Sequence, residues 1–513
     1  MKMDEKFLTY SALDSACMME IHNNFWETLT EDGYFPTYKM TTDLYPVLTF
    51  MQTRGMKVNH QLLEETRREV LEKAAILQEE LNTLIGKPLN VNSPKACAEY
   101  FYVTLSLPPI YNGKTKKVTT DDKAMQRLVR GTAKHPGIRQ AKLVQDIRGL
   151  QKLYSTYLSI TFDSDDRLRG AYNPRGTKFG RLSSSQTIFG TGMNFQNLPQ
   201  DFKKFLVADE GYMLVEVDKR QAEWVVVAYF ANDANMISAI KNNLDVHSHT
   251  ASLMFDLPIE IVKYENELIG HATSSVEVAK LRQEDPILKD LVTSKWPRSM
   301  SLRQCGKKSN HGLNYDEGYK NFALINEMEE TEAKRIVAMY HSIYPGIKIS
   351  YEVIKRQLQK DRTLSNCFGR KVRFMGEWGN DLWKSSYSMI PQSTVVDSLN
   401  KGMVRIYHDR FLTEEMNIDI LAQVHDSILM QIPLKNLQNE TLYNKIFQTI
   451  YSYITPEISY NNNSFTIKND AKFGKNWGGF NKNTNTQGMR DLTSFDDLTA
   501  YFAQESSNVS GTQ

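Results

Sequence analysis

The sequence predicts an α+β fold, because helical and strand-like stretches occupy separate parts of the chain. Residues 60–86 and the polar stretch from about 230 to 385 have the texture of helices. Short apolar, turn-bounded stretches begin near residue 170 and return at 418–433 and 458–468, as expected for strands. Runs of strands followed by runs of helices are typical of the α+β class.

The bulk composition is that of a globular protein. The 513 residues suggest two to four domains, and 41% hydrophobic with 24% charged residues is ordinary for such proteins. No apolar run reaches the roughly 18 residues of a membrane span and no signal peptide opens the chain, so we expect a cytoplasmic protein with no membrane partner. A net charge of +2 means that any nucleic-acid surface must be local.

The four cysteines form no pair with the spacing of a metal or redox motif. Cys17, Cys97, Cys305 and Cys367 are scattered along the chain. This pattern fits a reducing compartment and argues against structural zinc or a disulfide framework.

Residues 60–86 predict one long helix. Leu63, Val70, Leu77 and Leu84 recur at every seventh position, a narrow stripe suited to pairing with another helix. A second helical run covers residues 136–157. Between the two lies the basic segment GKTKKVTTDDK. Those lysines fit a solvated loop, and they equally fit contacts to nucleic-acid phosphates.

A carboxylate lies at the junction of two apolar runs in MLVEVDKRQAEWVVVAYF, residues 213–230. A lone Asp218 at a strand end is most often a helix N-cap. However, DILAQVHDSILMQIP, residues 419–433, predicts a hairpin with Asp426 at its tip. Two such carboxylates at one sheet edge repel each other unless a cation lies between them, and Mg²⁺ suits such a pair. Two metals held there can activate an attacking oxygen and stabilise a leaving one.

A cationic helix face could supply the phosphate ligands. Arg303, Lys307 and His311 are spaced i, i+4, i+8, and Tyr315 lies one turn further on. Alone, such a face is more often simply solvated. Beside a metal pair, it indicates a triphosphate-binding helix.

These motifs resemble those of the family A DNA polymerases, the relatives of bacterial DNA polymerase I. Asp218-Lys-Arg-Gln-Ala-Glu223 resembles motif A, the Arg303–Tyr315 pattern resembles motif B, and Val424-His425-Asp426 resembles motif C. The likeness runs in order from about residue 5 to residue 480. Further matching segments are KPLNVNSPKACAEYF (87–101), LQKLYSTY (150–157), GRLSSS (180–185), NFQNLP (194–199), DVHSHTASLMF (245–255), CFGR (367–370) and IPQSTVVD (390–397).

The resemblance implies a right-hand polymerase fold with an antiparallel-sheet palm, helical fingers and a helical thumb. The implied parts are a remnant of a 3′–5′ exonuclease domain at 1–41, the thumb at 42–165, the palm at 166–240 and 386–484, the fingers at 241–385 with an insertion near 256–297, and a flexible tail at 485–513.

The resemblance also implies template-directed DNA synthesis, in which dNTPs are added to a primer 3′-hydroxyl on primer–template DNA. Two Mg²⁺ ions would be held by Asp218, Asp426 and the Lys219 carbonyl, with Lys307 as a further catalytic group. The implied dNTP-binding residues are Arg303, Lys307, His311, Tyr315, Gln221 and Glu223, with Glu223 excluding a 2′-hydroxyl. The implied DNA-binding residues are Arg181, Asn194, Gln196, Asn197, Gln392 and His425.

Several positions depart from the family pattern. His311 replaces Phe or Tyr, Ser427 replaces Glu, Lys219-Arg220 replaces Tyr-Ser, and Ser388 replaces a common Asn. Single-subunit RNA polymerases share the three motifs and carry His-Asp-Ser in motif C, so Ser427 favours them, whereas Glu223 and the thumb matches favour DNA synthesis. A catalytically inactive DNA-binding scaffold is disfavoured because Asp218, Asp426 and Lys307 are all present.

The N-terminal segment 7–29 resembles the last part of the family's 3′–5′ exonuclease domain, and Tyr10-x3-Asp14 matches its final metal-binding motif. Only nine residues precede Tyr10, so we expect this chain alone not to proofread. The segment is expected to be a remnant helix packed under the thumb, or the docking site of a separate exonuclease polypeptide. This truncation and the tail suggest a bacteriophage replicase, acting in the cytoplasm of an infected host.

The tail from about residue 482 is rich in Asn, Thr, Gly and Ser, which predicts flexibility. Within TSFDDLTAYFAQE, residues 493–505, Leu498, Tyr501 and Phe502 have the spacing of peptides that bind sliding clamps, although Phe495 stands where such peptides have Gln. The alternative is that this apolar patch packs on its own domain.

Overall fold

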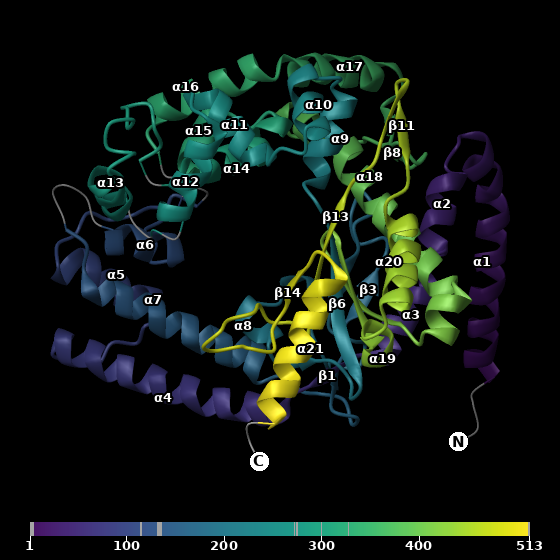
Figure 1. Ribbon diagram of the computed structural model, residues 1–513, viewed down its shortest axis with the longest axis horizontal. Coiled ribbons are helices and arrows are strands. Elements are labelled where there is room, and N and C mark those ends of the chain that lie inside the picture. The colour runs from purple at the N-terminus through teal and green to yellow at the C-terminus, as the bar shows by residue number, and fades with distance from the viewer. Residues whose placement is uncertain are drawn as a thin grey trace.

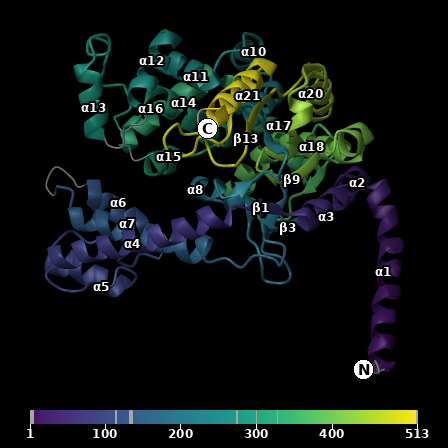
Figure 2. The same ribbon diagram turned by 60° about the horizontal axis from the view of Figure 1, so that its bottom comes forward.

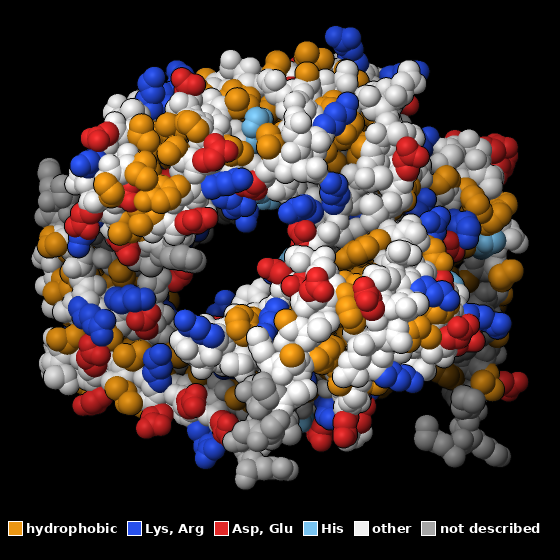
Figure 3. Space-filling view, in the orientation of Figure 1, with side chains coloured by type: hydrophobic (Ala, Val, Ile, Leu, Met, Phe, Trp, Pro, Cys, Tyr) orange, Lys and Arg blue, Asp and Glu red, His pale blue; other side chains and the backbone are white. Residues whose placement is uncertain are grey.

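The computed structural model describes residues 5–112, 115–130, 136–270, 272, 275–298, 300–326 and 328–510. Three groups of elements surround a central opening (Figure 1), and the opening persists when side chains are drawn (Figure 3). A β-sheet forms one side, a helical layer forms the top, and an arm of helices forms the bottom left. No helix in the described part of the chain is both long and apolar enough to span a bilayer.

The central sheet has five antiparallel strands in the order β14-β13-β6-β10-β9. The strands are β6 (Tyr212–Lys219), β9 (Asp419–Val424), β10 (Ser427–Pro433), β13 (Asn469–Gly474) and β14 (Arg490–Leu492). β6 lies in the middle because Met213, Leu214, Val215 and Val217 are fully buried, so both of its faces need cover. Residues of α18 (Asn380–His408) and α20 (Glu440–Ile454) belong to the same hydrophobic core.

The helical layer has a second hydrophobic core of its own. Its central pair is α11 and α14, which pack so closely that a Cβ on Gly306 would lie 2.3 Å from the His247 carbonyl oxygen. The layer comprises α9 (Ala222–Phe230), α10 (Ala234–Lys241), α11 (Val246–Phe255), α12 (Ile259–Ile269), α13 (Ser275–Glu284), α14 (Leu302–Gly312), α15 (Tyr319–Asn326), α16 (Glu330–Ile343) and α17 (Pro345–Asp361).

The arm is built on α4 (His60–Ile85), the long helix that the sequence predicts. Asn59 caps its first turn and Gly86, with a positive φ of 75°, ends it. Leu63, Val70 and Leu81 are buried, while Leu84 at the tip is exposed. α4 packs on α7. The arm also contains α5 (Pro94–Ala98), η1 (Glu99–Thr104), α6 (Asp122–Arg130), α7 (Arg139–Lys152) and η2 (Leu153–Leu158).

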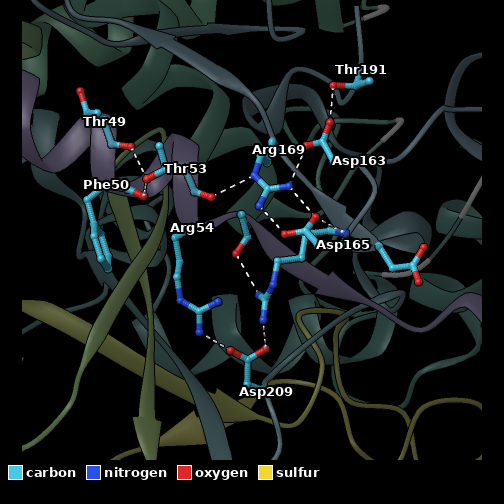
Figure 4. Close-up of polar contacts among 12 residues, drawn as sticks. Thr49, Phe50, Thr53, Arg54, Asp163, Asp165, Arg169, Thr191 and Asp209 are labelled. Atoms are coloured by element: carbon cyan, nitrogen blue, oxygen red, sulfur yellow. Dashed lines mark hydrogen bonds and ion pairs between the residues drawn. The ribbon is translucent and has the colours of Figure 1, made fainter. Parts of the chain in front are cut away.

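Basic side chains join α3 to the central sheet and to the segment that follows the arm (Figure 4). β1 (Met56–Val58) pairs with β2 (Arg167–Leu168) and β5 (Leu206–Val207), and α3 (Tyr45–Arg54) packs in the core of the central sheet. Arg54 bonds Asp209 and Asp419, and Arg169 donates to Asp163 and Asp165. Residues 45–58, which form α3 and β1, therefore pack with the sheet and precede the arm.

The N-terminal helix α1 (Glu5–Glu31) has no buried residue. It runs along the edge of the molecule opposite the arm and projects away from the body (Figures 1 and 2). Its base packs on α2 (Phe35–Thr42) through Trp26, whose ring meets those of Phe35 and Tyr38. The expectation that this segment packs under the thumb is therefore wrong, because the arm lies across the opening from it.

The C-terminal segment is ordered structure rather than the flexible tail that its composition predicts. β14 extends the sheet along β13, and α21 (Phe495–Ser510) packs behind it. Leu498 is fully buried and Tyr501 is 4% exposed, with the Tyr501 and Phe473 rings 5.4 Å apart. Leu498 and Tyr501 are thus core residues, Phe502 packs beside them, and the clamp-binding assignment is wrong.

Short elements complete the chain. They are β3 (Ala171–Asn173), β4 (Ser183–Ser185), η3 (Phe195–Asn197), α8 (Gln200–Lys203), η4 (Leu313–Tyr315), β7 (Thr363–Ser365), β8 (Lys371–Arg373), η5 (Phe411–Glu415), α19 (Leu434–Leu437), β11 (Ile458–Tyr460) and β12 (Asn463–Phe465).

Candidate active site

Asp218 and Asp426 lie at the same end of neighbouring strands. β9 and β10 form the predicted hairpin, with His425 and Asp426 in its two-residue turn and His425 at a positive φ of 52°. In the β6–β10 ladder, Asp218 is aligned with Ser427, the residue after Asp426. The main-chain N–H of Lys219 donates to the Asp426 carbonyl at 3.1 Å, which ties the hairpin tip to the end of β6.

Both carboxyl groups are held in an environment that disfavours their charge. Partial desolvation, followed by repulsion from Asp426 and Glu216, raises the pKa of Asp218 to about 6. Desolvation and the Glu223 charge likewise raise the pKa of Asp426. Among the described residues, none donates a hydrogen bond to the buried Oδ1 of Asp426. A buried, unpartnered carboxylate oxygen beside a second carboxylate fits a cation-binding site.

Asp218 and Asp426 could supply only some of the ligands of a metal ion. Within the described ranges, no cluster of three or more His, Cys, Asp or Glu side chains is arranged to bind one. Two carboxylates with an open remainder suit Mg²⁺, which usually keeps waters and binds substrate phosphates as further ligands. A fully protein-ligated structural metal would need a larger set.

The Lys219 side chain is directed into the protein. Its ammonium donates to Ser398 Oγ at 3.0 Å and to the Ile454 carbonyl, and burial lowers its pKa to about 7. Only the main chain of Lys219 is therefore available to the site. A lysine after a strand-end aspartate is usually exposed to solvent, so no pattern in the sequence predicts this burial.

The two aspartates open onto a cavity of about 1200 Å³. Glu216, two residues before Asp218 on β6, lines it and accepts hydrogen bonds from Ser427 Oγ at 3.0 Å and Trp477 Nε1 at 3.3 Å. Asp470 of β13 is aligned with Asp218 on the other side. Lys203 and Lys472 line the same cavity and offset some of this negative charge.

α14 carries the predicted cationic face. Ser301 caps the helix by accepting from the Gln304 N–H at 3.1 Å. Arg303, Lys307 and His311 line a second cavity of about 900 Å³. In Figure 3, Lys and Arg side chains gather along the upper edge of the opening, with Asp and Glu side chains clustered at its right edge.

Arg303 is paired with Asp245 at the start of α11. Its Nε donates to Oδ2 at 2.8 Å and its Nη2 to Oδ1 at 3.2 Å. Burial alone would raise the pKa of Asp245, but the hydrogen bonds from Arg303 and Ser248 lower it to about 2. The Arg303 guanidinium is therefore held in a fixed orientation, with its Nε and Nη2 bonded to the Asp245 carboxylate.

Glu223 connects the sheet to the helical layer. Its carboxylate accepts from Arg181 and, at 2.5 Å, from the Tyr315 hydroxyl. Gln221, in the left-handed conformation at the start of α9, donates to Asp245 at 3.2 Å. Glu223 is thus bonded to Tyr315, and Gln221 is bonded to Asp245, the partner of Arg303.

The predicted DNA-binding residues lie on several elements, which include η3, the hairpin and α18. η3 packs beside β9, and Asn194 caps its start by accepting from the Gln196 N–H at 2.9 Å. The Gln196 amide donates to the Leu182 carbonyl at 2.8 Å, and Asn197 ends the η3 turn. His425 is exposed at the tip of the hairpin. Gln392 is half-buried on α18, whose Asn400 donates to Gly180 beside Arg181 at 3.4 Å.

Comparison with known families identifies the chain. The model of DNA polymerase family A matches residues 60–267 and 292–479. The chain belongs to DNA polymerase family A. Its sequence is similar to DNA polymerase I of Helicobacter pylori, with 26% identity over 413 residues covering 78% of this chain and 40% of the relative. DNA polymerase I of Pseudomonas aeruginosa is 26% identical over 450 residues, which cover 82% of this chain and 43% of the relative. The thermostable DNA polymerase I of Thermus aquaticus is 26% identical over 471 residues, which cover 87% of this chain and 50% of the relative.

The family A chain thus spans half or less of the length of these relatives. Its fold matches the POL domain of Pol1 from M. smegmatis, solved in complex with DNA primer-template and dNTP, with a TM-score of 0.67 and 22% identity. The match covers 85% of this chain and 70% of that one. The right-hand polymerase fold predicted from the sequence is therefore confirmed.

Two residues of this family A site were missed by sequence reasoning. Asp245 has a signal, because an aspartate three residues before Ser248 and ahead of an apolar run predicts a helix N-cap, which it is. Its pairing with Arg303 has no sequence signal. Glu216 could have been found from the two-residue period of β6, which places it on the same face as Asp218.

Proposed function

We propose that the chain is a DNA-directed DNA polymerase that adds dNTPs to a primer 3′-hydroxyl under the direction of a template. The observation that carries this proposal is the placement of Asp218 and Asp426 at the same end of neighbouring strands, in a site that Gln221 and Asp245 connect to Arg303 of the cationic helix α14. The sheet is assigned as the palm, the layer from α10 to α17 as the fingers, and the arm from α4 to η2 as the thumb.

Asp218, Asp426 and the Lys219 carbonyl would hold two Mg²⁺ ions, which when bound promote attack by the primer oxygen and stabilise the leaving pyrophosphate. Arg303 and Lys307 bind the triphosphate. Pairing with Asp245 fixes the Arg303 fork, so little side-chain freedom is lost when the substrate arrives. Tyr315 supports the templating base pair, and Arg181, Asn194, Gln196, Asn197, Gln392 and His425 contact the duplex.

Primer extension tests this function directly. With a primed template and dNTPs, the purified chain should extend the primer to the template end. With rNTPs extension should be weak, and without nucleotide the primer should remain intact. Efficient extension with rNTPs would instead support an RNA-synthesising enzyme, and no extension with either would support a scaffold.

Glu223 is assigned to the exclusion of ribonucleotides. We expect Glu223→Ala to raise the ratio of rNTP to dNTP kcat/KM by about 10–100-fold, because the space vacated can hold a 2′-hydroxyl. Glu223→Gln keeps the volume of the side chain and should retain most of the discrimination. Steady-state kinetics with matched dNTP and rNTP measure the ratio. An unchanged ratio in Glu223→Ala would remove Glu223 from the sugar site.

A second proposal concerns α1, which we assign as the docking site of a separate 3′–5′ exonuclease polypeptide. Large apolar side chains are exposed along its length, including Phe7 (59%), Leu13 (59%), Met18 (66%) and Phe25 (59%). Within the described residues, Asp14 belongs to no group of three or more His, Cys, Asp or Glu side chains that could hold a metal ion. An exposed apolar helix is typical of a segment that docks in a partner's groove.

Purification from the native source tests this docking. The wild-type chain should retain a nuclease that degrades an unpaired primer 3′ end, whereas a Phe7→Ser, Leu13→Ser, Met18→Ser variant should lose it. The recombinant chain alone should leave that 3′ end intact. Degradation by the recombinant chain, or equal retention by the variant, would contradict the proposal.

A further inference from the structure

The family model leaves one internal segment unmatched, residues 268–291, which lies within a helical unit placed against α14. This unit, residues 256–297, contains α12, most of which the family model matches, and α13, which it does not; the unit is called the insertion below. Val262, Leu288 and Trp296 of the insertion share a small hydrophobic core with Ala251 of α11 and Leu302 of α14. The insertion is therefore built into the fingers, with its apolar side against the cationic helix.

A buried ion pair lies at the centre of the insertion. The Glu265 side chain is fully buried and that of Arg282 is 5% exposed. Nε and Nη2 of Arg282 donate to Glu265 Oε1 at 3.0 and 2.5 Å. Arg282 also donates to the carbonyls of Pro297 at 2.6 Å and Met300 at 3.0 Å, in the chain that leads into α14. The pair thus holds the segment that enters α14 in place.

The second oxygen of Glu265 reaches α14 itself. Oε2 accepts from the main-chain N–H of Leu302, the first residue of the helix, at 2.9 Å. Such N–H groups have no partner within the helix, and a carboxylate at this end is favoured by the helix dipole. Glu265 is therefore an N-terminal cap supplied from outside the helix.

Two further hydrogen bonds join the same turn to α12. Ser301 Oγ donates to Asn266 Oδ1 at 2.8 Å, and the Gln304 amide donates to the Gly270 carbonyl at 3.2 Å. The first turn of α14 is thus bonded to the insertion at three points. Arg303 lies in that turn, so the insertion fixes the position of the backbone from which the Arg303 side chain extends.

We propose that the insertion supports α14 and that Glu265 and Arg282 are positioning residues for nucleotide binding. The proposal rests on the proposed function, because it takes α14 as the triphosphate-binding helix. Neither side chain touches the substrate; they act by fixing Arg303 and, further along the helix, Lys307. Asn266, Glu267 and Gly270 of the insertion also form one wall of the cavity that these cations line.

The test compares Arg282→Met with the double variant Glu265→Leu, Arg282→Met. Arg282→Met leaves a buried carboxylate without its partner and should lower the midpoint of thermal unfolding. The double variant removes both charges and should recover much of this loss of stability. It still lacks the Glu265 carboxylate that accepts the hydrogen bond from the Leu302 N–H. In both variants we expect KM for dNTPs to rise about tenfold, with a smaller change in kcat and unchanged affinity for primer–template.

Hydrogen exchange provides a readout that is independent of catalysis. The main-chain amides of residues 301–305 should exchange faster in both variants than in the wild type. Tyr264→Phe is the matched control, because it breaks the 2.7 Å bond to Asp285 within the same insertion without touching α14. This control should have the wild-type KM and wild-type exchange at 301–305.

Two outcomes would overturn the proposal in different ways. A double variant with restored stability, wild-type exchange and wild-type KM would show that the pair does not position α14. The double variant could instead show faster exchange with an unchanged KM. If Lys307→Ala also had an unchanged KM, α14 would not bind the triphosphate, and the nucleotide part of the proposal would be wrong.

Discussion

Alanine in place of Asp218 or Asp426 is expected to lower the rate of nucleotide addition by about 10³-fold or more, because metal ions supply several kcal/mol of transition-state stabilisation. Affinity for primer–template should change little, since cationic contacts to phosphates supply most of it. Single-turnover primer extension and a DNA-binding titration measure the two effects. Asp491→Asn, an exposed carboxylate of the same cavity, is the matched control. Asp426→Ala retaining more than a tenth of the wild-type rate would contradict the assignment.

Substitution of Asp218 is expected to lower activity but to raise the stability of the folded protein. The pKa of Asp218 rises from 3.8 to about 6 in the folded protein, so folding favours the protonated form and stability is lost as pH rises through this range. Without metal at pH 7, Asp218→Asn should therefore unfold at a higher temperature than the wild type. Added Mg²⁺ should stabilise the wild type and have little effect on the variant.

The second large effect is expected from the C-terminal helix. Leu498→Ala should cost about 2–5 kcal/mol of stability, because Leu498 is fully buried and its removal leaves a cavity beneath the sheet. The midpoint of thermal unfolding and basal primer extension at elevated temperature report this loss. A surface peptide that serves only as a tether would leave both unchanged.

Thr499→Ala supplies the control for this substitution, since Thr499 lies next to Leu498 on α21 with its side chain exposed. It should unfold within about 0.5 kcal/mol of the wild type. If Leu498→Ala were as stable as Thr499→Ala, α21 would not contribute to the core.

The sequence located the site because its residues lie on elements with strong local patterns. Asp218 and Asp426 end apolar strands whose alternation predicts their pairing, and Arg303 and Lys307 share a helix face by spacing alone. The resemblance then assigned their roles. The site was predictable to the extent that secondary structure aligned the side chains.

The sequence predictions that were wrong concern residues whose surroundings are formed by other parts of the chain. The tail is polar in composition, but its Leu498 and Tyr501 pack in a core to which β13, β14 and α20 contribute. Lys219 looks exposed by type, but Ser398 and Ile454 surround its ammonium. The position of α1 depends on a few contacts with α2, and nothing in its own residues predicts its separation from the arm.

The strand order of the sheet has a consequence for synthesis of the chain on the ribosome. β6 is made early, yet both of its neighbours, β10 and β13, and the edge strand β14 belong to the last part of the sequence. Until residues 427–492 emerge, the apolar β6 has two unpaired edges, the state in which strands associate wrongly. Since translation adds about 5–20 residues per second, this exposure lasts on the order of ten seconds or more. The helical layer between them can fold in that interval, so we expect a nascent chain with formed fingers and an incomplete palm to be the species that most needs a chaperone.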